Sequence, residues 1–269
     1  PVIIGVGVVA VLGALLFKAG AVPAHFWVPD AAQGASTWAA AFATTVPKVG
    51  GRVAMYRLLG ELTPGIEWPL LIAVVAAVTM TLGNLAAFNQ TDPRRLLGWS
   101  TVSQAGYLLL PVAVAGGSDL ASSSLLLYLA AYAVTNVTAF AVIAAVPGLT
   151  TVSDYRGLAR SHPWLAGALA ISLLSLVGTP PTAVFIGKLT TFAAAWDGGF
   201  AWLVAVAAVN TVASLFYYLR WLAPAFDLGD ISVEFSAPRP AGRRTALLGA
   251  VSILALGIGS GGLWTVLSL

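Results

Sequence analysis

Residues 164–196 read WLAGALAISLLSLVGTPPTAVFIGKLTTFAAAW, and this stretch decides the fold. A membrane-spanning helix needs about 20 mostly apolar residues, so these 33 residues exceed one straight span. Two adjacent prolines remove backbone hydrogen bonds near the middle. The stretch therefore predicts a discontinuous transmembrane helix interrupted at Thr179–Pro181, an arrangement that marks ion sites in transporters. A plain proline kink that only serves packing is the alternative.

The composition of the whole chain indicates the same lipid surroundings. Of 269 residues, 59% are hydrophobic and 9% are charged, whereas a soluble domain carries roughly 25% charged residues. Such a chain cannot cover its surface against water, which excludes a soluble enzyme, a nucleic-acid-binding protein and a disordered tail. There is no cysteine, and the two histidines are far apart. We therefore expect no cofactor and no metal in this chain.

The chain contains eight apolar stretches long enough to cross a bilayer. They are long and continuous rather than short and alternating, so we predict an all-α integral membrane protein and not a β-barrel. We expect a second broken helix near Pro23, and Asp92 followed by Pro93 predicts a capped helix start. The predicted spans are residues 2–21, 36–59, 68–88, 94–115, 120–146, 164–196, 200–226 and 245–267.

The arginines indicate an orientation. Alternating loops place most of them on one side, which the positive-inside rule makes cytoplasmic. The first residue is a proline directly before an apolar run, so we expect the chain to be the later part of a longer protein or a truncated one. The arginines of the predicted cytoplasmic side are Arg94, Arg95, Arg156, Arg160, Arg220, Arg239, Arg243 and Arg244.

The three lysines have a different distribution, because Lys18, Lys48 and Lys188 all lie within apolar stretches. A charged lysine at the centre of a membrane helix costs on the order of 2.5–3.5 kcal/mol. A buried amine can load and release a proton near neutral pH, which an arginine cannot do. We interpret the lysines as proton-carrying sites; the alternative is that their side chains extend to the interface.

His25 lies between two prolines beside the predicted first break. Imidazole titrates near neutral pH, so His25 is a candidate proton relay between Lys18 and Lys48. The alternative is a hydrogen-bonded histidine in an interfacial loop.

Polar residues also recur at helical spacing within the apolar stretches. Lys48 and Arg52 are four residues apart, as are Tyr132 and Asn136. In lipid such faces should turn inward, where they would line a hydrated proton path. The alternative is that they hold helices together by hydrogen bonds. The supporting candidates are Tyr107, Tyr132, Asn136 and Asn210.

Several motifs resemble one known family, the antiporter-like subunits of respiratory complex I (NADH–quinone oxidoreductase). The YRGL loop and the lysine of FIGK make the chain most similar to the subunit N branch of that family. The motifs are FKAGAVPAHFWVPDAAQGAS at 17–36, TTVPKVGG at 44–51, NQTDPRRLLGWSTVSQAGYLLL at 89–110, the region from DYRGL at 154–158 to 195, and VNTVASLFYYLRW at 209–221.

The resemblance implies a protein of 14 helices with two inverted five-helix repeats, of which this chain holds helices seven to fourteen. Residues 1–66 would be the last two helices of the first repeat, 67–226 the second repeat, and 227–269 a surface segment with the final span. Lys18 matches a lysine that pairs with a glutamate upstream of residue 1. Lys48 matches the central lysine, and Lys188 the exit lysine, of the proton path.

The resemblance further implies proton translocation in a bacterial cell membrane, coupled to electron transfer from NADH to quinone. NADH, FMN, iron–sulfur clusters and quinone would belong to the rest of the complex. The expected partners are neighbouring membrane-arm subunits and the bilayer, with no nucleic acid. The alternatives are a subunit of a multi-subunit cation/proton antiporter or membrane-bound hydrogenase, and a purely structural membrane scaffold.

Overall fold

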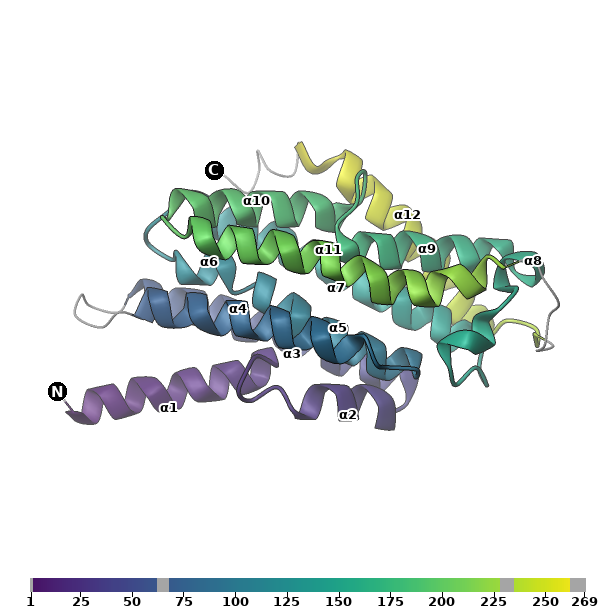
Figure 1. The fold of residues 1–269 in the computed structure, drawn as a ribbon, viewed down its shortest axis with the longest axis horizontal. Helices are drawn as coiled ribbons and strands as arrows, with labels where there is room; N and C mark the ends of the chain where they lie inside the picture. Colours follow the sequence, from purple (N-terminus) through teal and green to yellow (C-terminus); the bar gives the residue numbers. More distant parts are fainter. Residues whose placement is uncertain (1, 62–67, 228–234, 262–269) are drawn as a thin grey trace.

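The computed structural model describes residues 2–61, 68–227 and 235–261, and in these parts it contains helices and no strand. Most of the helices run along the long axis of the molecule (Figure 1), as the predicted all-α membrane fold requires. The helices are α1 Val2–Ala19, α2 Trp27–Gly34, α3 Thr37–Gly60, α4 Trp68–Ala87, α5 Pro93–Tyr107, α6 Leu110–Ala113, α7 Leu120–Ala145, the 3₁₀ helix η1 Val152–Tyr155, α8 Leu158–Ser161, α9 Pro163–Val177, α10 Ala183–Asp197, α11 Ala201–Ala225 and α12 Pro240–Ile258.

Every predicted span coincides with one helix or with a pair of helices. In the described part, α4, α7, α11 and α12 are each long and apolar enough to cross a membrane, and α1 and α9 contribute shorter apolar helices. The last predicted span corresponds to α12, and its residues 262–267 lie outside the described residues. The same is true of the predicted boundary at residue 66 and of part of the segment 227–244.

Both predicted broken helices are present. The stretch 164–196 consists of α9 and α10, which lie end to end and are separated by residues 178–182 (Figure 1). Likewise α1 ends at Ala19, and α2 begins at Trp27 beyond Pro23. These two interruptions place irregular backbone between otherwise regular helices.

Two predicted boundaries are wrong. The span 94–115 is not one helix, because α5 ends at Tyr107 and α6 begins at Leu110; Pro111 has no amide hydrogen to continue the helical pattern. The final helix begins at Pro240 rather than at residue 245, since proline suits the first turn of a helix. Arg243 and Arg244 therefore lie on α12 and not in the preceding loop.

The interior of the bundle is formed around α5 and α7. Helix α7 packs against α3, α9, α10 and α12, and α5 packs against α2 and α4. Polar side chains on these helices and on α11 turn inward, including the four supporting candidates. Their buried members are Ser100, Ser103, Gln104, Tyr107, Tyr128, Tyr132, Asn136, Asn210, Ser214, Tyr217 and Tyr218.

The start of α5 has the predicted cap, because the Asp92 carboxylate accepts hydrogen bonds from the amides of Arg94 and Arg95 at 2.8 and 3.0 Å. Replacing Asp92 with alanine should cost about 1 kcal/mol and lower the unfolding temperature in detergent by about 2–4 °C. Asp119 provides a matched control, since it precedes α7 without a side-chain cap bond. Equal unfolding temperatures for Asp92→Ala and Asp119→Ala would contradict this assignment.

Candidate functional site

The first half of the broken helix in the second part of the chain ends at a left-handed glycine. Gly178 has φ of +92°, and the Thr179 amide donates to the Leu174 carbonyl at 3.1 Å. This arrangement is a Schellman motif, which leaves the last two carbonyls of α9, those of Leu176 and Val177, without a backbone partner. The Nζ of Lys188 donates to the Val177 carbonyl at 2.8 Å.

Lys188 is held in a small polar cluster. Its side chain is buried, and its Nζ lies 4.1 Å from the centre of the Tyr107 ring and 3.5 Å from the Thr211 hydroxyl. The Thr211 hydroxyl in turn donates to the Tyr107 hydroxyl at 3.1 Å. The aromatic face and the negative end of the α9 dipole both favour a positive charge at this position.

The first broken helix ends in the same way. Gly20 has φ of +69°, and the Ala21 amide donates to the Leu16 carbonyl at 3.0 Å. The last carbonyl of α1, that of Ala19, has no backbone partner, and Lys48 Nζ donates to it at 3.0 Å. Lys48 is fully buried, and its Nζ lies 5.4 Å from the Trp27 ring centre. Lysines from different positions in the chain thus meet equivalent helix ends.

The spacing of Arg52 to Lys48 places it on a predicted polar face, but Arg52 is not among the predicted site residues. The structure places its guanidinium, also fully buried, on the same helix end. One terminal nitrogen donates to the Ala19 carbonyl at 3.2 Å, and the other donates to the Lys48 carbonyl at 3.1 Å. The signal in the sequence was an arginine one turn after a lysine within an apolar helix.

Lys18 and His25 lie at the first break but not in contact with Lys48. Lys18 is exposed, although its Cγ lies beside α3, 3.5 Å from the position that a Cβ on Gly51 would take. His25 is half-buried, with its ring centre 5.7 Å from that of Trp99. Within the described parts of the chain, no hydrogen bond joins either residue to Lys48.

Tyr132 and Asn136 attach α7 to α3 one turn before Lys48. The Tyr132 hydroxyl donates to the Thr44 carbonyl at 2.9 Å and to the Thr101 hydroxyl at 3.1 Å. The Asn136 amide donates to the hydroxyls of Thr44 and Thr45, each at 2.9 Å. The structure therefore brings these two predicted residues together beside the Lys48 region.

Helix α5 carries polar side chains from this region towards Lys188. Thr101, Gln104 and Tyr107 are spaced by three residues on α5, and all are buried. Gln104 donates to the Leu176 carbonyl at 2.8 Å, one residue before the carbonyl that binds Lys188. Gln104 also accepts from the Tyr128 hydroxyl at 2.5 Å. The polar stripe of α5 therefore connects the surroundings of the two lysines.

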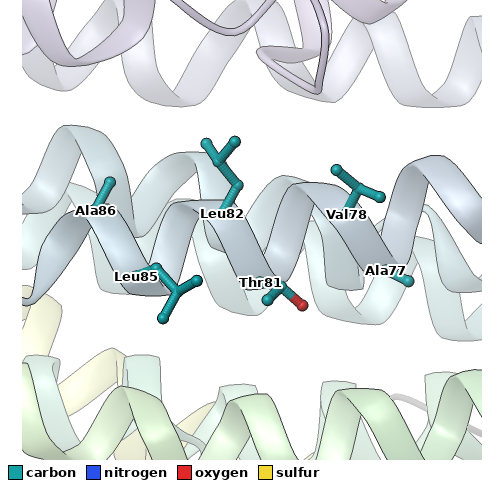
Figure 2. A pocket seen from close by; sticks show the side chains of 6 residues that line it. All are labelled: Ala77, Val78, Thr81, Leu82, Leu85 and Ala86. Carbon is teal, nitrogen blue, oxygen red and sulfur yellow. The ribbon is translucent and has the colours of Figure 1, made fainter.

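Asn210 belongs to a neighbouring cluster between α11 and α4. Its amide donates to the Thr81 hydroxyl at 3.0 Å, and its side-chain oxygen accepts from Asn84 at 2.9 Å. Figure 2 shows Thr81 on α4, pointing to the side of α11. It contributes the hydroxyl to a shallow, apolar pocket of about 560 Å³ lined by Ala77, Val78, Thr81, Leu82, Leu85 and Ala86.

The ion pairs lie at one end of the bundle, whereas Lys48 and Lys188 lie in its interior. The three ion pairs found among the described residues are Arg94–Asp92, Arg95–Asp30 and Arg156–Asp227, all at the end marked by α2 and α8 in Figure 1. Neither Lys48 nor Lys188 has a carboxylate partner in the described parts. Those parts also contain no cluster of His, Asp or Glu suited to a metal ion.

Asp154 lies in the loop at this end and caps η1. Burial by itself would raise the pKa of its carboxyl, but hydrogen bonds from the amides and hydroxyls of Thr150 and Thr151 lower the pKa below its usual value. Asp154 therefore stays ionised and stabilises the loop at neutral pH.

Comparisons with known proteins match this chain to helical membrane proteins of one family. Residues 3–214 match the family described as NADH:quinone oxidoreductase/Mrp antiporter, TM. NADH-quinone oxidoreductase subunit N of Mycobacterium sp. (strain JLS) is 60% identical over 99% of this chain, and subunit N 1 of Streptomyces griseus is 59% identical over 95%. The chain spans 57% and 55% of the lengths of these relatives.

Two solved structures extend the comparison. A chain of respiratory complex I from Thermus thermophilus superimposes with a TM-score of 0.82 and 32% identity, covering 94% of this chain and 56% of its own length. A chain of the Mrp complex from Dietzia sp. DQ12-45-1b superimposes with a TM-score of 0.88 and 26% sequence identity. The match covers 100% of this chain and 59% of the Mrp chain. The fold is that of the antiporter-like membrane subunits.

The chain belongs to the NADH:quinone oxidoreductase/Mrp antiporter family of transmembrane proteins. Within it, the high-identity relatives carry the name subunit N.

The geometry of the second break predicts a specific role for Gly178. A Cβ there would lie 2.9 Å from Lys188 Cδ, and the left-handed backbone costs a non-glycine residue about 1–2 kcal/mol. Gly178→Ala should therefore lower the unfolding temperature and displace the Lys188 side chain from its position. Gly167→Ala on α9 is the matched control, because its Cβ would meet open space and alanine favours helix. Thermal unfolding that shows no difference between the two variants would refute this role.

Proposed function

We propose that this chain is a proton-translocating subunit of the membrane arm of an NADH–quinone oxidoreductase. The 60% identity to a protein named subunit N supports the assignment. NADH, FMN, iron–sulfur clusters and quinone would be held by other subunits, and the neighbours in the membrane would be further membrane-arm subunits. In this proposal the chain moves protons while electron transfer takes place elsewhere in the complex.

The observation that carries the proposal is the pair of buried lysines bound to helix-end carbonyls. A carboxylate partner would favour the charged lysine strongly, whereas a neutral carbonyl and an aromatic face stabilise it more weakly. An amine in such a site can alternate between its charged and neutral forms. Because charges interact strongly at low dielectric, a change at one lysine would influence the other.

The proposed path enters near Lys18 and His25 at the first break and continues through Lys48. Tyr132 and Asn136 stand beside it, and the polar stripe of α5 leads from there to the second break. Tyr107 underlies the exit lysine, Lys188, and Asn210 supports the neighbouring part of α11. Water is required to bridge the steps, since the polar groups form separate hydrogen-bonded clusters.

We propose the inverted-repeat organisation on the same basis. Residues 1–66 would close a first repeat, 67–226 would form the second, and 227–269 would add a surface segment and the final span. The matching helix ends at Gly20 and Gly178 support this division, because each repeat would then contribute one broken helix and one buried lysine.

The lysines provide the main functional test. In the assembled complex, Lys48→Ala or Lys188→Ala should slow proton transfer at the altered site by about 100-fold or more and so lower NADH-driven proton pumping. Pumping is measured with a pH-sensitive dye in inverted membrane vesicles, and assembly by native electrophoresis. Arg57→Ala, which removes an exposed charge from the same helix as Lys48, should pump normally. Full pumping in both lysine variants would instead favour a structural scaffold.

A cation/proton antiporter subunit is the second candidate, favoured by the TM-score of 0.88 with the Mrp complex over the whole chain. A membrane-bound hydrogenase subunit is a related possibility. The same lysines would serve either protein. Sodium-dependent proton movement without NADH would support the antiporter, whereas pumping that requires NADH oxidation supports the complex I assignment.

The arginine distribution supports a proposed orientation with the α2 and α8 end in the cytoplasm. The chain has no cysteine, so single cysteines report on each end. Cysteine at exposed Ser153 should react with a membrane-impermeant maleimide only in inverted vesicles, and cysteine at exposed Gly117 only in intact spheroplasts. The reverse labelling pattern would overturn the orientation.

A further inference from the structure

We propose that Arg52 is a positioning residue that favours release of the proton from Lys48. This inference rests on the proposed function of Lys48 as a proton carrier. It assigns a role to the second buried cation at the first helix break, which the proton path itself does not use.

Lys48 and Arg52 share one acceptor. Lys48 Nζ lies 3.0 Å, and a terminal nitrogen of Arg52 3.2 Å, from the Ala19 carbonyl oxygen. The two nitrogens are therefore at most about 6.2 Å apart. Both side chains are fully buried, and a guanidinium keeps its charge. At this separation and burial, the fixed charge of Arg52 repels a second charge on Lys48.

The described residues around this pair offer no compensating negative charge. Lys18 on α1 is exposed and supplies no negative charge, and α6 carries no titratable side chain. The titratable groups that face the pair from α7 are the neutral hydroxyls of Tyr128 and Tyr132. The other titratable groups of neighbouring elements have partners of their own or lie further away. His25 packs on Trp99. The carboxylates of Asp30 and Asp92 are next to Arg95 and Arg94, and Tyr56 and Arg57 follow on α3 towards its far end.

Arg52 also keeps the Ala19 carbonyl hydrogen-bonded when Lys48 moves away from it. A buried carbonyl without a hydrogen-bond donor is unfavourable, so a lysine that was the sole donor would be held in place. Arg52 donates to the same Ala19 carbonyl. The neutral Lys48 amine can therefore leave the carbonyl, which remains paired.

The second site differs in this respect. Lys188 donates to the Val177 carbonyl and contacts Thr211 and Tyr107, and in the described structure no arginine shares its acceptor. The repulsion acts at Lys48 alone. Arg52 thus makes a positive charge less favourable on Lys48 than on Lys188, and this difference favours proton movement away from Lys48.

The test is the pH profile of NADH-driven pumping by the assembled complex in inverted vesicles. Removing the fixed charge with Arg52→Met should let Lys48 keep its proton at higher pH, so the alkaline limb should move up by about one pH unit. Arg52→Gln, which keeps a hydrogen-bond donor, should show the same shift and serves if the methionine variant does not assemble. Arg52→Lys and the exposed control Arg57→Met should retain the original profile.

An unchanged alkaline limb in the assembled Arg52→Gln complex would overturn the inference. The double variant Lys48→Ala/Arg52→Gln should show no shift relative to Lys48→Ala, because Arg52 acts through Lys48. Full pumping by Lys48→Ala at every pH would instead reject the proposed function itself. The two failures are therefore distinguishable.

Discussion

A helix that stops inside a membrane leaves carbonyl groups without water to bind, and the rest of this structure depends on how those groups are satisfied. Both broken helices solve the problem first with a left-handed glycine, Gly20 or Gly178, which folds the backbone onto its own last turn. The last carbonyl of each helix, that of Ala19 or Val177, is then bound by a lysine from beyond the break, Lys48 or Lys188. The hydrogen bond that pairs the last backbone carbonyl of each broken helix is thus also the contact that positions its buried lysine.

The same constraint explains the polar interior. Helix α5 is mostly buried although it carries Ser100, Thr101 and Gln104, because its polar face meets hydroxyls and carbonyls of neighbouring helices rather than lipid. The ion pairs of the described residues lie instead at the end of the bundle marked by α2 and α8, where carboxylates pair with arginines. The interior therefore retains cations at sites where neutral acceptors, and not fixed anions, surround them.

Much of this was predictable because the signals are local. The helix breaks follow from the proline and glycine patterns near Pro23 and Pro180, and the buried lysines follow from their position in apolar runs. The contacts that join side chains of different helices were not predictable. The spacing of Lys48 and Arg52 predicted that their shared face of α3 turns inward, but not that both side chains reach one carbonyl. The exposure of Lys18 was not predictable, because α1 is apolar on all sides and its periodicity does not show which face meets the bundle.

The sequence by itself determined a helical membrane protein with two interrupted helices, with three lysines within apolar stretches and with most of its arginines near one end of the bundle. Composition and spacing suffice for these properties, since they depend on transfer between water and lipid and on local backbone chemistry. Only the tertiary structure decided that Lys48 and Arg52 share the Ala19 carbonyl and that Lys188 rests on Tyr107. Those contacts join residues from different helices, and the packing of the bundle brings them together.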